Sequence, residues 1–326
     1  MSAATELFAE PAVAPRNLTN DEVLALRRRF YEDGTISFDE AAELFRIGER
    51  IDAAGPDWTE FFIEALTDTI VRQAEPSGYV SEDNADWLIA HIMRDGEVGS
   101  RCELQLLVHI LECADHIPSQ LRSFVLAVVA DATLSGNGAL LGDDHLIPGV
   151  IGKPEAKLIR RIIFAGASTG TTWVARTEAD FLFDLNDATA DAANDSAWQN
   201  LFVQGITNHL MSTQIHQPAE PERALEIQRW MEDTSQSVGG FLGRMFSSIP
   251  RYRATSSYES AMADDNASNI AALDAGAQVT GDEAAWLIDR ITRDGHLHDN
   301  EIAVLVYLRD HAPQMCKSLD TLIGQI

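Results

Sequence analysis

The chain has 326 residues with 24 basic and 51 acidic side chains, which gives a formal charge of −27 at pH 7. This length suits two domains or one duplicated body, and it allows a core that needs neither disulfides nor metal for stability. The acidity disfavours nucleic acid as a partner, because the phosphate backbone would be repelled. No apolar run is long enough for a transmembrane span, and three cysteines without a spaced framework favour a cytoplasmic location.

Apolar residues recur at helical spacing along most of the chain, which predicts an all-α fold. The expected helices include segments around residues 26–31, 61–71, 104–111, 124–129 and 155–164. Residues 124–129 are so densely apolar that a fully buried helix is expected there. No stretch alternates between apolar and polar residues as a strand does, so any strand would be brief.

Seven of the expected helices begin with one pattern, an apolar residue followed four positions later by Glu or Asn. The pairs are Leu18 and Glu22, Ile36 and Glu40, Val80 and Asn84, Ile151 and Glu155, Val174 and Glu178, Val279 and Glu283, and Leu297 and Glu301. A Ser or Thr three residues before the Glu predicts capping boxes at Thr19, Ser37, Ser100 and Thr280. In a capping box the hydroxyl accepts from a free helix N–H, and the carboxylate accepts from the cap residue's own N–H.

An Asp-Gly pair precedes three of these turns, at residues 33–34, 95–96 and 294–295. The motif Asp-Gly-x-apolar-x-x-x-Glu looks like the second half of an EF-hand loop. The first ligand position of that loop would be Arg29 or Arg290, and an arginine cannot bind calcium. We therefore expect no tight calcium binding at these turns.

Helical pairs joined by this motif resemble the TerB-like domains of tellurite-resistance and related stress proteins. The resemblance rests on the turns from Asp33 to Glu40, from Asp95 to Glu103 and from Asp294 to Glu301. It implies compact, acidic, all-helical domains with degenerate EF-hand-like turns. It also implies a link to metal or stress responses.

Similar segments recur along the chain and predict an internal duplication. Trp58 and Trp198 lie 140 residues apart in matching segments, and Trp87 and Trp286 lie 199 residues apart in another matching pair. We expect an N-terminal tail at 1–17 and two homologous multi-helix halves, the first half at 18–135 and the second half at 146–326. The increase in spacing predicts an insertion at 213–277 within the second half.

The turn near the C-terminus gathers potential metal ligands. Two imidazoles and three carboxylates occur in eight residues, at Asp294, His296, His298, Asp299 and Glu301. Imidazole together with carboxylate suits zinc, nickel or iron, so this turn is a candidate site for a divalent metal. The alternative is a solvated turn that caps the next helix.

A second group of potential ligands lies on one expected helix. His109, Cys113 and His116 are spaced so that they share a face, and a thiolate with two imidazoles could bind zinc. The surrounding leucines and isoleucines make this helix a core element. The pattern therefore favours a buried cysteine and a hydrogen-bonded histidine.

The insertion contains an apolar helical stripe that predicts an interaction surface. Its residues are Ile227, Trp230, Met231, Val238, Phe241, Leu242, Met245, Phe246 and Ile249. Such a stripe covers the protein's own core, binds a partner groove or second copy, or lies on a membrane surface. Deleting residues 213–276 is expected to leave both halves folded and to remove a binding or oligomerisation activity.

These patterns together favour a non-enzymatic cytosolic interaction or sensing protein, with another protein or a second copy as its partner. One alternative is a metal-dependent enzyme that uses the cluster from His296 to Glu301. Another is a structural adaptor that docks through the helix at 227–249.

Overall fold

A computed structural model describes residues 17–51, 54–94, 98, 100–136, 147–165, 174–211, 279–311 and 319. These residues are helical and contain no strand, with one isolated parallel bridge between Tyr79 and His116. The prediction of an all-α fold is confirmed. Among the described helices, none has the length and apolar character needed to cross a membrane.

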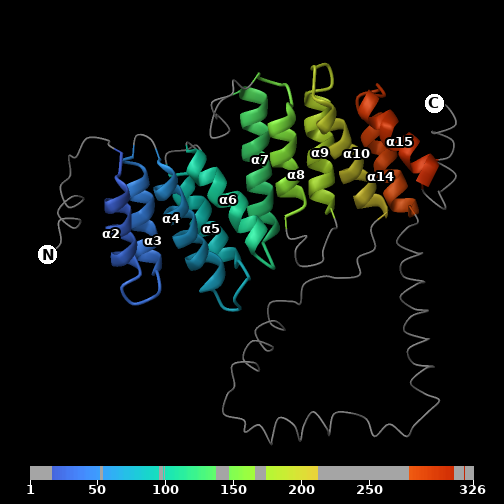
Figure 1. The fold of residues 1–326 in the computed structure, drawn as a ribbon. Coiled ribbons are helices and arrows are strands. Elements are labelled where there is room, and N and C mark those ends of the chain that lie inside the picture. Colours follow the sequence, from blue (N-terminus) through green and yellow to red (C-terminus); the bar gives the residue numbers. More distant parts are fainter. Residues whose placement is uncertain are drawn as a thin grey trace, which may run out of the picture.

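The described helices follow one another along an extended row, with α2 at one end and α15 at the other (Figure 1). In the first half they are α2 (Asn20–Phe30), α3 (Phe38–Gly48), α4 (Pro56–Thr67), the π-helix η1 (Asp68–Arg72), α5 (Glu82–Ile92), α6 (Arg101–Cys113) and α7 (Ser119–Ser135). In the second half they are α8 (Lys153–Ile163), α9 (Arg176–Ala188), α10 (Ser196–Met211), α14 (Gly281–Thr292) and α15 (Asp299–His311).

The predicted capping boxes fix where several helices begin. Thr19, Ser37, Ser100 and Thr280 are the N-cap residues of α2, α3, α6 and α14, and each has its Glu three residues later in the box. A box satisfies two helix N–H groups that would otherwise lack partners. The sequence therefore locates these four starts correctly.

One helix at the centre of each half organises its packing. Helix α4 packs against α2, α3 and α6, and helix α10 packs against α8, α9 and α15. The two halves meet where α6 and α7 pack on α8 and where α7 packs on α9. Ion pairs between Arg122 and Glu178 at 3.1 Å, and between Arg161 and Glu112 at 2.7 Å, cross this junction.

Each half contains a frame of four aromatic side chains. The first frame comprises Phe45, Trp58, Phe62 and Trp87, and the second comprises Phe183, Trp198, Phe202 and Trp286. Phe45 and Phe62 meet edge-on with ring centroids 5.3 Å apart, and Phe183 and Phe202 meet edge-on at 5.1 Å. The helix order and these contacts are those expected of a duplication, and the duplication itself stays a prediction.

Helix α7 corrects one expectation. Residues 124–129 are helical as predicted, but the helix is not fully buried. Val125 and Val129 are buried, whereas Ala127 and Leu134 on the same helix are exposed. A high density of apolar residues therefore did not mean that the whole helix is buried, because one side of α7 faces water.

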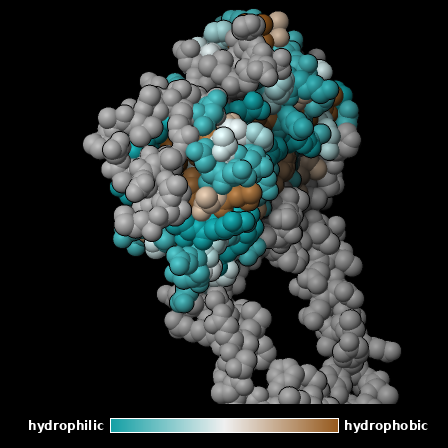
Figure 2. All heavy atoms as spheres, turned by 60° about the vertical axis from the view of Figure 1, so that its left-hand side comes forward, coloured by the Kyte–Doolittle hydropathy of each residue, from teal (hydrophilic) through white to brown (hydrophobic). Residues whose placement is uncertain are grey.

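The surface of the described residues is largely polar. Figure 2 shows a face dominated by hydrophilic side chains, with hydrophobic residues confined to a smaller area. The exposed large hydrophobic side chains are Leu24, Phe38, Leu134, Ile147, Leu297 and Tyr307, which lie in separate segments of the chain. Single exposed apolar residues of this kind are normal on a globular protein.

Candidate functional site

The predicted metal-binding turn forms a network of local hydrogen bonds. Asp294 Oδ1 accepts from the backbone N–H of His296 at 2.9 Å, and Asp294 Oδ2 lies 2.8 Å from His298 Nε2. Both bonds lower the pKa of Asp294, and the bond from the His296 N–H has the larger effect. The same contact with Asp294 raises the pKa of His298.

Glu301 serves as the capping carboxylate of α15. Its Oε2 accepts from the backbone N–H of His298 at 2.8 Å, and the residue is only 1% exposed. Burial raises the pKa of Glu301 to about 7, although the bond from His298 acts in the opposite direction. Burial also raises the pKa of nearby Asp187. The turn thus contains groups whose charges change near neutral pH.

The described structure brings Asp294 and His298 together but does not gather all five predicted ligands around one point. His296 and Asp299 are exposed, while Glu301 is buried and faces the helix start. Within the residues that the structure describes, no three His, Cys, Asp or Glu side chains are placed to hold a metal ion. The divalent metal therefore stays a prediction from sequence.

The second group of potential ligands is split. His109 Nε2 and Cys113 Sγ lie 3.3 Å apart on α6, but the His116 ring stacks on Tyr79 with centroids 5.4 Å apart. Burial raises the pKa of the Cys113 thiol, which disfavours the thiolate that zinc requires. The contact between His109 and Cys113 lies within a single helix. Cys113 is exposed, so the expectation of a buried cysteine is wrong.

The predicted partner-binding stripe lies outside the described residues. All nine of its side chains, from Ile227 to Ile249, belong to the segment 212–278 that the structure does not describe. The stripe and the insertion therefore stay predictions.

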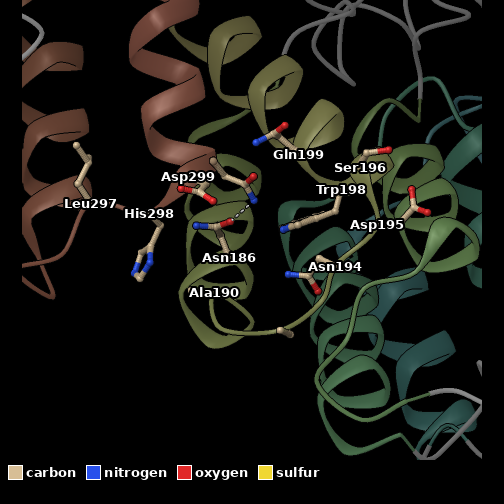
Figure 3. Close-up of a pocket in the computed structure, with 12 residues that line it drawn as sticks. Asn186, Ala190, Asn194, Asp195, Ser196, Trp198, Gln199, Leu297, His298 and Asp299 are labelled. Carbon is tan, nitrogen blue, oxygen red and sulfur yellow. Dashed lines mark hydrogen bonds between the residues drawn. The ribbon is translucent and has the colours of Figure 1, made fainter. Parts of the chain in front are cut away.

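The structure reveals a polar pocket that the sequence did not suggest. It has a volume of about 440 Å³ and lies where the end of α9, the following loop, the start of α10 and the start of α15 meet. Figure 3 shows the side chains that line it, which include the three amide residues Asn186, Asn194 and Gln199. A fourth amide, that of Asn300, completes what we call the amide pocket.

Two buried N–H groups of the amide pocket have no hydrogen-bond partner among the described residues. They are Nδ2 of Asn186 and Nε1 of Trp198. Asn186 is 2% exposed and Trp198 is fully buried. Leaving such a buried donor unsatisfied costs about 1–3 kcal/mol. The pocket therefore contains donors that are suited to an acceptor atom other than those of the described residues.

Neighbouring bonds fix the orientation of these donors. Asn186 Oδ1 accepts from Asn300 Nδ2 at 2.7 Å, so the Nδ2 group of Asn186 points away from Asn300 (Figure 3). Asn194 holds the loop, because its Oδ1 accepts from the N–H of Ile151 and its Nδ2 donates to the carbonyl of Thr189, both at 2.8 Å. The pocket is thus built on tethered backbone and is largely formed before any ligand enters.

The first half carries different side chains at the positions that the predicted duplication would match. At the predicted spacings, Asn186 would correspond to Gly48, Gln199 to Thr59 and Asn300 to Cys102. A hydrogen bond joins Cys102 to Thr59, and burial raises the pKa of the Cys102 thiol to about 12. None of these three first-half side chains carries an amide. A position-by-position comparison of the halves is the signal that would have located the pocket from sequence.

A buried arginine on α14 is a further difference between the halves. Arg290 Nη2 donates to Asp184 Oδ1 at 2.6 Å and to the carbonyl of Asp180 at 3.3 Å, and its side chain is 3% exposed. Its first-half counterpart His91 instead lies against Trp87, with ring centroids 4.0 Å apart. The same position is therefore ionic in one half and aromatic in the other.

Comparisons with known proteins do not assign this site. No family model, no curated protein and no solved structure matches the chain.

Proposed function

We propose that the protein is a non-enzymatic sensing protein that binds a small polar molecule in the amide pocket. The observation that carries this proposal is the pair of unsatisfied donors, Asn186 Nδ2 and Trp198 Nε1, in a pocket that both residues line. A volume of about 440 Å³ falls within the range of small-molecule sites, roughly 300–1,000 Å³.

The arrangement of titratable groups favours binding over catalysis. The pocket is lined by His298 and Ser196, the combination from which a nucleophile and its base could be built. The Nε2 atom of this imidazole is engaged by Asp294 at 2.8 Å. A nucleophile and its base must lie within hydrogen-bond reach of each other, and among the described residues no hydrogen bond joins Ser196 to His298. The unsatisfied donors of the pocket are amide and indole N–H groups, which can hold a ligand but do not serve as a general acid or base.

A sensing protein also needs an output, and we assign it to the insertion on sequence grounds. The apolar stripe from Ile227 to Ile249 suits a protein partner or a second copy of the chain. A cytosolic location, supported by the free cysteines Cys102 and Cys113, is part of the proposal. The resemblance to TerB-like domains supports a role in a stress response.

Thermal unfolding with a set of small polar compounds tests the proposal. A ligand at one hundred times its Kd stabilises the folded state by about 2.7 kcal/mol, so a binder raises the melting temperature measurably. We expect Asn186→Ala and Trp198→Phe each to reduce this rise. Trp58→Phe makes the same ring change at the equivalent place in the first half, and we expect it to leave the rise unchanged.

Two outcomes would contradict the proposal. One is that no compound of any charge class raises the melting temperature of the wild-type protein. The other is a rise that persists in full in both Asn186→Ala and Trp198→Phe.

A further inference from the structure

We infer that the ligand of the amide pocket is a neutral, hydroxyl-rich molecule such as a hexose or a cyclic polyol. This inference rests on the proposed function and names the class of molecule that the site recognises.

The deepest groups require an acceptor. Asn186 and Trp198 present N–H donors that no described residue satisfies. In Figure 3 the indole nitrogen of Trp198 faces the side of the pocket that holds Asn186. An ammonium group carries only donors, so it would leave both N–H groups unsatisfied. A simple amine is therefore a poor ligand.

The remaining charged groups disfavour an anion. Asp195 and Asp299 line the pocket with exposed carboxylates, and no Lys or Arg is among its lining residues. The N-termini of α10 and α15 could attract an anion, but side-chain carboxylates of the chain already accept hydrogen bonds there. Asp195 Oδ1 accepts from the N–H of Ala197 at 2.8 Å, and Glu301 accepts from the N–H of His298. His298 also lines the pocket, but its Nε2 atom already lies 2.8 Å from the Asp294 carboxylate. A carboxylate or phosphate ligand would therefore be repelled by Asp195 and Asp299.

A hydroxyl group satisfies both sides of the pocket. Its oxygen accepts from an N–H donor, and its proton is donated to a carboxylate, so one group type suits Asn186 as well as Asp299. A ring with several hydroxyls presents acceptors and donors in several directions. Asp299 and Asp195 both line the pocket, so such a ring has carboxylate acceptors available as well as the N–H donors.

Titration calorimetry of the full chain with matched probes tests the ligand class. Glucose, mannose and myo-inositol are the neutral probes. Glucuronate and glucosamine keep the sugar ring and add a negative or a positive charge. We expect at least one neutral probe to bind ten-fold or more tightly than both charged sugars. Asn186→Ala is expected to weaken that binding by about five- to ten-fold, the effect of one lost hydrogen bond.

The outcomes separate this inference from the proposed function. Tighter binding of glucuronate or glucosamine overturns the neutral class and leaves a small-molecule site in the pocket. Binding of none of the five probes likewise overturns the hydroxyl-rich class. The proposed function falls only if the broader compound set also fails to stabilise the protein. Unchanged affinity of the neutral probe in both Asn186→Ala and Trp198→Phe would show that it binds elsewhere, which overturns the inference.

Discussion

The two halves share a hydrophobic frame and differ in the polar residues around it. Trp58 and Phe62 in α4 have rings 5.7 Å apart, and Trp198 and Phe202 in α10 have rings 6.2 Å apart. Around the first frame lie Gly48, Thr59 and Cys102, whereas Asn186, Gln199 and Asn300 lie around the second. The shared aromatic frame is needed for stability, because both halves need a packed core. The polar side chains around the frame differ between the halves, and we propose that those of the second half carry the function.

The same contrast appears on the face formed by α3 with α5 and by α9 with α14. Phe38 lies edge-on to Trp87 at 5.0 Å, while Arg176 lies over the Trp286 ring at 4.4 Å. An aromatic contact is thus replaced by a cation–π contact.

The largest expected effect comes from removing the buried arginine of the second half. Arg290→Ala should lower the free energy of unfolding by about 2–4 kcal/mol, because Asp184 and Asp180 lose a buried partner. This loss of stability is smaller than that expected for a fully buried ion pair, because Asp184 is itself exposed. His91→Ala should cost less, since it removes a partly buried ring. Chemical denaturation measures both values, and equal losses would contradict the contrast between the halves.

A smaller effect should appear in the pH dependence of α15. The pKa of Glu301 is raised to about 7, so the folded state holds its proton more tightly than the unfolded state does. Stability therefore falls as the pH rises from about 4.5 to about 7. The raised pKa of His298 acts in the same direction, because its stabilising charge is lost as the pH rises through that pKa.

Glu301→Gln should reduce this pH dependence, because it removes the titrating carboxyl while keeping an oxygen that accepts from the His298 N–H. Amide hydrogen exchange in α15 at pH 5 and pH 7.5 measures the change. Glu103→Gln, at the matching capping position in α6, controls for loss of a capping carboxylate. An unchanged pH profile in Glu301→Gln would show that this buried carboxyl is not responsible.

The smallest effect should come from Gly48, the first-half counterpart of Asn186. A Cβ atom added there would meet Phe62 and Trp58 at 3.8 Å, which is ordinary van der Waals contact. Gly48→Ala should therefore stabilise the protein by about 0.5–1 kcal/mol by reducing the entropy lost in the helix. A lower melting temperature for this variant would show that the first half has no room where the second half accommodates an amide.

The helices and their starts were predictable from sequence, whereas the pocket was not. The capping box at Ser37 and Glu40 depends on residues three positions apart, so local chemistry determines it. The bond from Asn300 to Asn186 joins residues 114 positions apart, and only the packing of α15 beside α10 brings them together. The metal prediction used the spacing of potential ligands along the chain, and this spacing does not determine the directions in which their side chains point.

The Trp198 indole N–H gives the most direct test of the central claim that the amide pocket binds a ligand through its free donors. Its resonance in a proton–nitrogen correlation spectrum is identified by its loss in Trp198→Phe. We expect this resonance to shift, and the shift to saturate, as the neutral probe selected by calorimetry is added, while the Trp58 indole resonance stays in place. A Trp198 resonance that does not move at saturating probe would contradict the account.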